Sequence, residues 1–414
     1  MATAPRIPAP RRALEALALV LWLSAASQAA QHYKVLFNFN GIDGYAPLGG
    51  VTLDDTGRLY GAAGNGGTGE CTNGCGLVFE LYPMLDGDWT EEILYSFQGA
   101  PDGEGPGGNV FIGPDGGLFG TTTFGGTNDK GTVFRLTKGT RGWEEKVLYS
   151  FCYVGYCPHI PESGVVRDNA GNLYGTAFEA YELSPTENGW REDTLYSFKD
   201  GHDGALPFAG LILDPKGNLY GTTYGGGYGC SNTSSCGTVY ELSPGLDGKW
   251  IHTVLFRFNG KNGQFPGAGA LYMDSNGALY GTTEGGGKYA GVLFRLTPQS
   301  NGQWNFAILH NFLQGSQGYE PDAGVVMDTL GNLYGTTTGG GGPSGCGVLY
   351  KLSPTENDKW SYSVLHTFGG NGDGCFASGN LVIDQQGNLY GSLILGGEYG
   401  YGVVFEYSTI PSPQ

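Results

Sequence analysis

Short apolar runs alternate with glycine-rich polar turns along nearly the whole chain, from residue 33 to residue 407. Segment 237–242 shows the apolar and polar alternation of a half-buried β-strand. A Leu-aromatic-Gly triplet recurs seven times, at residues 59–61, 118–120, 173–175, 219–221, 279–281, 333–335 and 389–391. Such internal repetition indicates a repeat architecture in which each unit is one supersecondary motif.

Each unit contains the same four segments in the same order. A short apolar run such as 211–213 comes first, the triplet second, a strand such as 237–242 third and a strand such as 147–151 fourth. A glycine precedes every triplet, which predicts a hairpin between the first two strands. Six of these seven turns also carry an aspartate, with Gly113 as the exception. We interpret these aspartates as caps of their own turns, with calcium binding as the alternative.

The two ends of the repeat region share one unit. Residues 35–39 form a lone fourth strand, whereas the last unit ends with its third strand at residues 403–407. Pairing these ends leaves no blade with a missing outer strand, and radial repetition limits exposed strand edges. The sequence therefore predicts an all-β, seven-bladed β-propeller with four antiparallel strands per blade, its N-terminal strand closing the last blade. It forms a single domain over residues 31–414.

The first thirty residues differ from the repeats. Three arginines precede an apolar stretch from Ala13 to Leu23, followed by small residues. This layout predicts a signal peptide over residues 1–30, and the apolar stretch is too short for a membrane span. The formal charge of −18 disfavours nucleic acid and anionic membranes, so we expect neutral or cationic partners and a monomer.

Eight cysteines suggest disulfides, as expected of an even number in a secreted chain. Three pairs follow from proximity and the fourth by elimination: Cys71 with Cys75, Cys152 with Cys157, Cys230 with Cys236, and Cys346 with Cys375. A zinc site requires other spacings, so no metal is predicted.

The repeat resembles a known family. The motif Asp-x-x-Gly-Asn-Leu-Tyr-Gly-Thr-Thr occurs at 214–223 and 328–337, and is followed by Gly-Gly and Gly-x-Val-Phe-x-Leu-like segments. It is similar to the secreted bacterial choice-of-anchor proteins with the tandem GloVer repeat. The resemblance implies a propeller-like fold, but no reaction and no catalytic residues. Unlike that family, this chain shows no evident C-terminal anchor.

Strand alternation places the loops between second and third strands, and those between fourth and first strands, on one face, which we call the top face. All eight cysteines lie in or beside these loops, as do the loop aspartates Asp43, Asp102, Asp203 and Asp373. A rigid ring carrying long cross-linked loops is where binding is usually found, so Asp102, Asp203 and Asp373 are candidate ligand-binding residues. His310 and His366 share a fourth-strand position with Tyr95 and are interpreted as packing residues, whereas His159 and His202 remain candidate ligands or bases.

The third unit departs most from the repeat. It lacks the glycine-rich loop before its third strand, and Arg167 occupies a position that is apolar in the other units. Broken local rules cluster at functional or strained sites. We therefore predict a notch in the top rim beside this unit, and its residues are Tyr153, Tyr156, His159, Glu162 and Arg167.

These features favour a secreted, non-catalytic binder of an extracellular glycan, cell-wall polymer or protein, with no cofactor, although calcium remains an alternative. A second hypothesis is a carbohydrate-active hydrolase or lyase that uses top-face carboxylates such as Asp102, Asp203, Glu284 and Asp373. A third is a structural cell-surface repeat protein.

Overall fold

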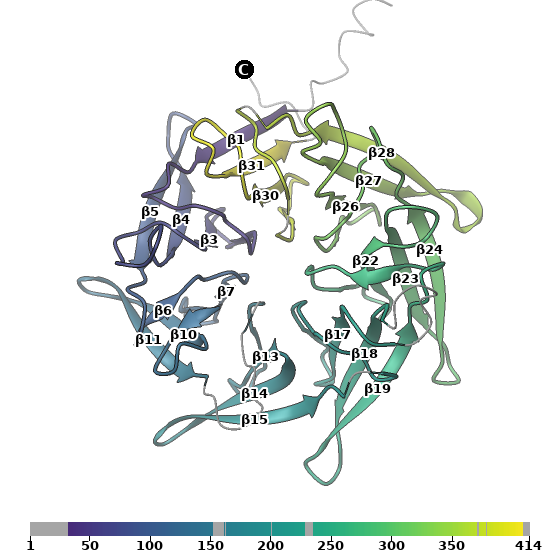
Figure 1. The fold of residues 1–414 in the computed structure, drawn as a ribbon, viewed down its shortest axis with the longest axis horizontal. Helices are drawn as coiled ribbons and strands as arrows, with labels where there is room; N and C mark the ends of the chain where they lie inside the picture. The colour runs from purple at the N-terminus through teal and green to yellow at the C-terminus, as the bar shows by residue number, and fades with distance from the viewer. Residues whose placement is uncertain are drawn as a thin grey trace, which may run out of the picture.

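Seven four-stranded antiparallel sheets stand in a ring around a central axis, which confirms the predicted propeller (Figure 1). The computed structural model describes residues 32–151, 161, 163–199, 201–227, 235–370, 372–377 and 379–408. Within these residues no helix is long and apolar enough to cross a membrane.

The blades are numbered in chain order, and the strands of each run from the axis outward. Blade 1 contains β2 (Val51–Leu53), β3 (Leu59–Ala63), β4 (Leu77–Pro83) and β5 (Trp89–Ser96), and blade 2 contains β7 (Phe111–Ile112), β8 (Leu118–Thr122), β10 (Thr132–Gly139) and β11 (Gly142–Ser150). Blade 3 contains β12 (Val166–Arg167), β13 (Leu173–Ala177), β14 (Glu179–Thr186) and β15 (Gly189–Ser197), and blade 4 contains β16 (Ile212–Leu213), β17 (Leu219–Thr223), β18 (Thr238–Pro244) and β19 (Trp250–Arg257). Blade 5 contains β21 (Tyr272–Met273), β22 (Leu279–Gly285), β23 (Val292–Pro298) and β24 (Trp304–Asn311), and blade 6 contains β25 (Val326–Met327), β26 (Leu333–Thr336), β27 (Val348–Pro354) and β28 (Trp360–Thr367). Blade 7 contains β29 (Val382–Ile383), β30 (Leu389–Leu393), β31 (Val403–Ser408) and β1 (His32–Asn38).

Three short strands and one 3₁₀ turn lie outside this scheme. The loop strand β6 (Gly103–Glu104) pairs with β9 (Phe124–Gly125), and β20 (Gln264–Pro266) adds to β22 in blade 5. A 3₁₀ turn, η1 (Glu356–Asp358), precedes β28.

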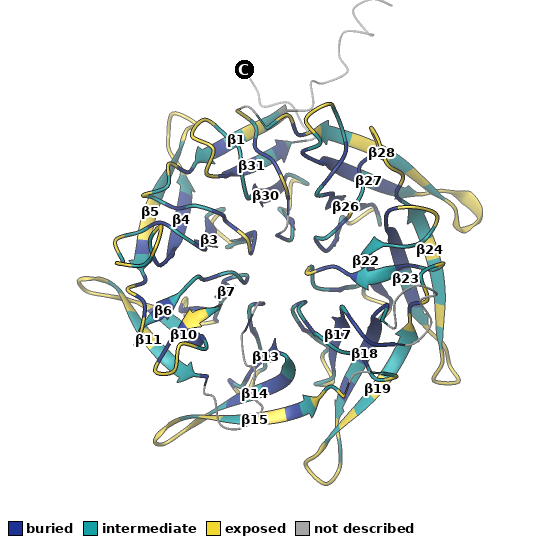
Figure 2. Ribbon diagram, in the orientation of Figure 1, coloured by how far each residue is buried: buried dark blue, intermediate teal, exposed yellow. Residues whose placement is uncertain are grey.

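The Leu-aromatic-Gly triplet has a packing explanation. Its leucines are at most 1 % exposed in every blade and form the blade cores, which are the dark blue inner strands of Figure 2. The glycine is required because an aromatic ring of the third strand lies against it: a Cβ on Gly61 would lie 2.4 Å from Cζ of Phe79. The triplet glycine therefore leaves room for one large third-strand ring between neighbouring blades.

Hydroxyl side chains connect neighbouring blades. Thr121 Oγ1 in blade 2 donates to the Ser163 carbonyl at 2.7 Å, and Thr282 Oγ1 in blade 5 donates to the Ala323 carbonyl at 3.0 Å. Ser392 Oγ makes the corresponding bond from blade 7 to the Pro47 carbonyl of blade 1, at 2.8 Å. The ring thus closes with the same kind of contact that joins blade 2 to blade 3 and blade 5 to blade 6.

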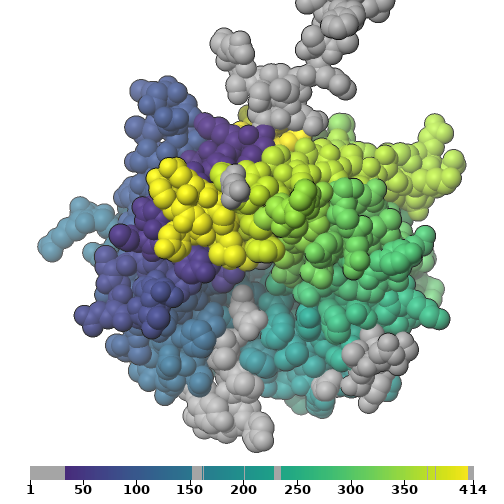
Figure 3. All heavy atoms as spheres, turned by 45° about the horizontal axis from the view of Figure 1, so that its top comes forward, coloured from purple at the N-terminus to yellow at the C-terminus, as the bar shows by residue number. Residues whose placement is uncertain are grey.

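The predicted strand closure is also confirmed. β1 pairs with β31 in antiparallel register, with Tyr33 opposite Tyr407 and Asn38 opposite Val403. In the space-filling view the purple N-terminal segment lies beside the yellow C-terminal strands (Figure 3). Fourth-strand tryptophans also pack across blade interfaces, as Trp250 of blade 4 does against Tyr174 of blade 3 at a centroid distance of 5.8 Å.

Two predicted disulfides are formed, Cys71–Cys75 and Cys346–Cys375. The second joins a loop of blade 6 to the loop that enters blade 7. Cys236 is also disulfide-bonded. Cys230, Cys152 and Cys157 lie outside the described residues, so the other two predicted pairings remain predictions.

Candidate functional site

The turn aspartates act as caps, as predicted. Asp214 Oδ1 accepts the backbone N–H of Asn218 at 2.9 Å, and its Oδ2 accepts the Tyr220 hydroxyl at 3.3 Å. Asp328 and Asp384 make the corresponding bonds in blades 6 and 7. These carboxylates hold the turn between the first two strands, on the face opposite the top loops.

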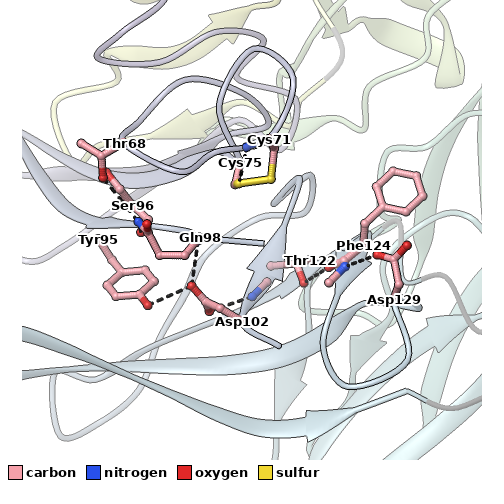
Figure 4. Close-up of a disulfide and its surroundings, with 12 residues drawn as sticks. Thr68, Cys71, Cys75, Tyr95, Ser96, Gln98, Asp102, Thr122, Phe124 and Asp129 are labelled. Carbon is pink, nitrogen blue, oxygen red and sulfur yellow. Dashed lines mark hydrogen bonds between the residues drawn. A yellow bond between two sulfur atoms is a disulfide. The ribbon is translucent and has the colours of Figure 1, made fainter. Parts of the chain in front are cut away.

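The three loop aspartates predicted as ligands lie in three separate loops. Asp102 Oδ2 accepts the Tyr95 hydroxyl at 2.9 Å and the Gln98 N–H at 2.9 Å, beside the Cys71–Cys75 disulfide (Figure 4). Asp203 accepts the Tyr196 hydroxyl at 2.6 Å, and Asp373 contacts His366 Nε2 at 3.0 Å. Each of these aspartates therefore ties its loop to the fourth strand of the preceding blade, and the fold does not gather them into one site.

The notch predicted beside blade 3 falls largely outside the described residues, since these do not include Tyr153, Tyr156, His159 and Glu162. Arg167 ends β12 and is half-buried, as are the apolar residues at the same position in the other blades. Its guanidinium reaches the following turn, where Nη2 would lie 3.0 Å from a Cβ on Gly171. The site role of these five residues remains a prediction.

A different set of top-face residues surrounds the central axis. Each of six loops that enter a blade contains one residue with a left-handed backbone, with φ between 56° and 68°. These residues are Ala46, Gly105, Leu206, Phe265, Glu320 and Phe376. Hydrogen bonds enforce this conformation, which is uncommon for residues other than glycine. For example, the backbone N–H of Glu320 donates to the Ala290 carbonyl at 3.1 Å, and the backbone carbonyl of Glu320 accepts the Thr338 N–H at 3.0 Å.

We call these six residues, together with the third residue after the triplet glycine of each blade, the mouth. The second set is Gly64, Thr123, Phe178, Tyr224, Glu284, Thr338 and Ile394. The backbone of the mouth repeats around the ring, but its side chains do not. Blades 1 and 2 contribute small residues, blades 3 to 5 contribute aromatic ones, and blades 5 and 6 contribute carboxyl groups.

The aromatic residues form a continuous row across three blades. Phe178 contacts Phe208 at a ring-centroid distance of 6.3 Å, and Phe208 contacts Tyr224 at 5.9 Å. Tyr224 stacks on Phe265 at 4.9 Å with 16° between the ring planes. All four rings are half-buried, so the row keeps partly exposed apolar surface.

A pair of carboxyl groups lies at the end of this row. The Tyr224 hydroxyl donates to Glu284 Oε2 at 3.3 Å, while Asp322 Oδ1 accepts the Ala268 N–H at 2.8 Å. Burial raises the pKa of Glu284 well above its usual range, and the adjacent carboxylates of Asp322 and Glu320 raise it further. Glu284 therefore retains a proton in the empty site at pH values where an exposed glutamate has lost it.

Asp322 also lines a cavity on the propeller axis. This cavity has a volume of about 660 Å³ and takes wall residues from all seven blades, among them Leu48, Thr123, Ser163, Asp322 and Ile394. That volume lies within the usual range for small-ligand sites, roughly 300–1,000 Å³. Much of the wall is backbone, because adjacent loops approach closely at glycines: a Cβ on Gly108 would lie 2.2 Å from the Gly164 nitrogen.

Of the sequence candidates that fall within the described residues, only Glu284 belongs to this arrangement. The aromatic row and Asp322 were not anticipated. A signal was present, because the third residue after the triplet glycine and the left-handed loop residue vary between otherwise regular repeats.

The repeat sequence and the fold both have known relatives. The pattern of the Gloeobacter/Verrucomicrobia repeat matches residues 23–180, 179–342 and 289–412, whereas no curated protein matches significantly. Among solved structures, the extracellular domain of BT4673 from B. thetaiotaomicron is 14% identical with a TM-score of 0.55, over 93% of this chain and 41% of that one. PorZ, a surface component of the type-IX secretion system of Porphyromonas gingivalis, is 18% identical with a TM-score of 0.50, over 90% of this chain and 48% of that one.

This chain thus spans less than half the length of either structure, and the likeness concerns the fold. Because the three repeat matches together cover nearly all of the sequence, the chain belongs to the Gloeobacter/Verrucomicrobia repeat family.

Proposed function

We propose that this protein is a secreted, non-catalytic binding protein whose mouth takes an extracellular glycan. The observation that carries the proposal is the aromatic row of Phe178, Phe208, Tyr224 and Phe265, which ends at the Glu284–Asp322 pair, where Asp322 lines the axial cavity. Aromatic rings offer large, rigid apolar surface on which the faces of sugar rings can stack. Carboxyl and hydroxyl groups at the end of the row supply hydrogen bonds that orient a polar ligand.

Several features support a location outside the cytoplasm. Disulfides persist in oxidising compartments, and two are formed in the described residues. Residues 1–30 have the pattern of a signal peptide. The two similar structures are an extracellular domain and a surface component, which agrees with this location.

A glycan array read beside a polysaccharide depolymerisation screen tests the proposal. Retention without turnover supports a binder, and Tyr224→Ala or Phe265→Ala should then lower the affinity at least tenfold. Tyr399→Ala is the matched control, because Tyr399 is 53% exposed in a loop of blade 7, away from the row. Silence in both assays would refute a glycan binder and favour a structural surface protein.

One observation favours a hydrolase or lyase as a second candidate. Glu284 has a raised pKa and faces the mouth, as a general acid would. However, Glu284 and Asp322 are in contact, whereas the two carboxylates of a glycoside hydrolase stand roughly 5–9.5 Å apart. A second catalytic group would have to come from elsewhere. Release of shorter products in the screen, abolished by Glu284→Gln, would establish the enzyme.

A further inference from the structure

The aromatic row and the carboxyl pair are parts of one surface. Tyr224 belongs to both, because its ring stacks on Phe265 while its hydroxyl donates to Glu284. A ligand stacked on Tyr224 therefore meets Glu284 and Asp322 at its next polar group. A cation is attracted by carboxylates and also by the face of an aromatic ring.

The charged residues of the mouth itself are all acidic. None of the described mouth residues is basic, and three of them or their neighbours are acidic: Glu284, Glu320 and Asp322. The whole chain carries a formal charge of −18. The field at the mouth thus repels uronic acids, sulfated sugars and phosphates, and attracts cations.

From this complementarity we propose that the glycan bound at the mouth is an amino-sugar polymer, whose ammonium group lies between the aromatic row and the Glu284–Asp322 pair. This inference rests on the proposed function, because it specifies the ligand of the same site. It requires no metal and no chemical step.

Binding should be linked to a proton. In the empty site Glu284 faces Asp322, Glu320 and the Tyr224 hydroxyl, and two adjacent carboxyl groups cannot both ionise without a large penalty. An ammonium group beside them offsets that repulsion, so Glu284 loses its proton when the cation arrives. Affinity for a cation should therefore rise with pH until Glu284 is ionised in the free protein.

Calorimetry with two amino-sugar tetrasaccharides tests the charge preference and the linked proton release separately. One is fully N-acetylated and neutral, and the other is N,N,N-trimethylated, so its charge does not change with pH. We expect the cationic tetrasaccharide to bind roughly tenfold more tightly. Titrations in two buffers of different ionisation enthalpy, at one pH near 7, should show net proton release for the cationic ligand alone.

Conservative variants identify the groups responsible. Glu284→Gln and Asp322→Asn should abolish the preference for the cationic over the neutral ligand, and Glu284→Gln should also abolish proton release. Glu187→Gln is the matched control, because it removes the same charge from the exposed tip of the β14–β15 hairpin. Melting temperatures of all variants show that each one is folded.

The possible outcomes are distinct. Equal affinity for both tetrasaccharides, or a preference that survives both carboxyl substitutions, overturns this inference and leaves the glycan binder standing. Binding of a lysine-rich peptide in preference to either sugar overturns the assignment to an amino sugar. Failure of both sugars, together with a silent glycan array, overturns the proposed function itself.

Discussion

The outer strands of neighbouring blades meet in two different ways on two arcs of the ring. Between blades 3 and 7 a ring on each fourth strand stacks on a ring of the next blade: Tyr196–His252, Phe256–Phe306, His310–Tyr362 and Tyr33–His366, at 4.0–4.1 Å and within 7° of parallel. We call these the stacked interfaces. In blades 1, 2 and 3 the same fourth-strand position is a glutamate, namely Glu91, Glu145 and Glu192. We call the interfaces that each of these blades makes with the preceding blade the glutamate interfaces.

Burial shifts the pKa values of the titratable groups at the two kinds of interface in opposite directions. Burial lowers the pKa of His252 and His310 to about 4, so the stacked interfaces hold these rings neutral. Burial, with the nearby carboxylate of Asp43, raises the pKa of Glu91 to about 8, and burial with Asp102 raises that of Glu145 to about 7. One repeat position thus accepts either a neutral ring or a protonated acid, and pH should weaken the two arcs from opposite sides.

The largest expected effect comes from removing a stacked ring. Phe306→Ala should lower the free energy of unfolding by about 3 kcal/mol, because it deletes a ring that contacts Phe256 and Phe294. Glu145→Ala should cost no more than about 1 kcal/mol, because Glu145 Oε1 is buried with no partner in the described structure. Urea unfolding at pH 6 measures both, and equal losses would show that the two arcs are energetically alike.

Acid should act on the stacked interfaces. Since the unfolded histidine titrates near 6.5 and folded His310 near 4, the unfolded state binds more protons between these values. Stability should therefore fall as pH drops from about 6.5 to 4, by up to about 3 kcal/mol for His310. His310→Phe, which copies Phe256, should flatten this part of the stability curve. An unchanged curve would mean that His310 accepts its proton in the folded protein.

Alkali should act on the glutamate interfaces. Folded Glu91 keeps its proton up to a pKa of about 8, whereas the unfolded chain loses it near 4.5. The stability contributed by the protonated group is full below pH 4.5 and is lost as pH rises through 8. After allowance for partial solvent exposure, Glu91→Gln should be about 2 kcal/mol more stable than the wild type at pH 9. Thermal melts at pH 5 and pH 9 test this, with no such gain expected at pH 5.

The smallest effect concerns a buried hydroxyl. Tyr350 is fully buried against Gly335 with no partner for its hydroxyl in the described structure, whereas Phe79 fills the same place in blade 1. Tyr350→Phe should stabilise the protein by up to about 1 kcal/mol. The control Tyr334→Phe should cost about 1 kcal/mol, because the Tyr334 hydroxyl donates to Asp328 at 3.0 Å. A loss of stability in Tyr350→Phe would reveal a partner for that hydroxyl, such as a buried water.

Most of the fold could be predicted because its determinants are local. Glycine before the triplet, the aspartate cap and the two-residue strand period act within a few residues of one another, so each unit can be recognised by itself. The split unit at the two ends then implies closure, and β1 does pair with β31. Cys71–Cys75 was predictable for the same reason, because its two cysteines are only 4 residues apart.

The sequence by itself determined seven equivalent blades and their order, but only the tertiary structure decided which loop residues meet. Phe178, Tyr224, Glu284 and Asp322 belong to four different blades, and ring closure brings them to one axis. The alternation of strands places Asp102 and Glu284 on the same face of the ring. It does not reveal that Asp102 accepts hydrogen bonds from Tyr95 and the Gln98 N–H, whereas Glu284 faces another carboxyl group. Side-chain partners and desolvation arise from neighbours distant in sequence, and these set the chemistry of the mouth.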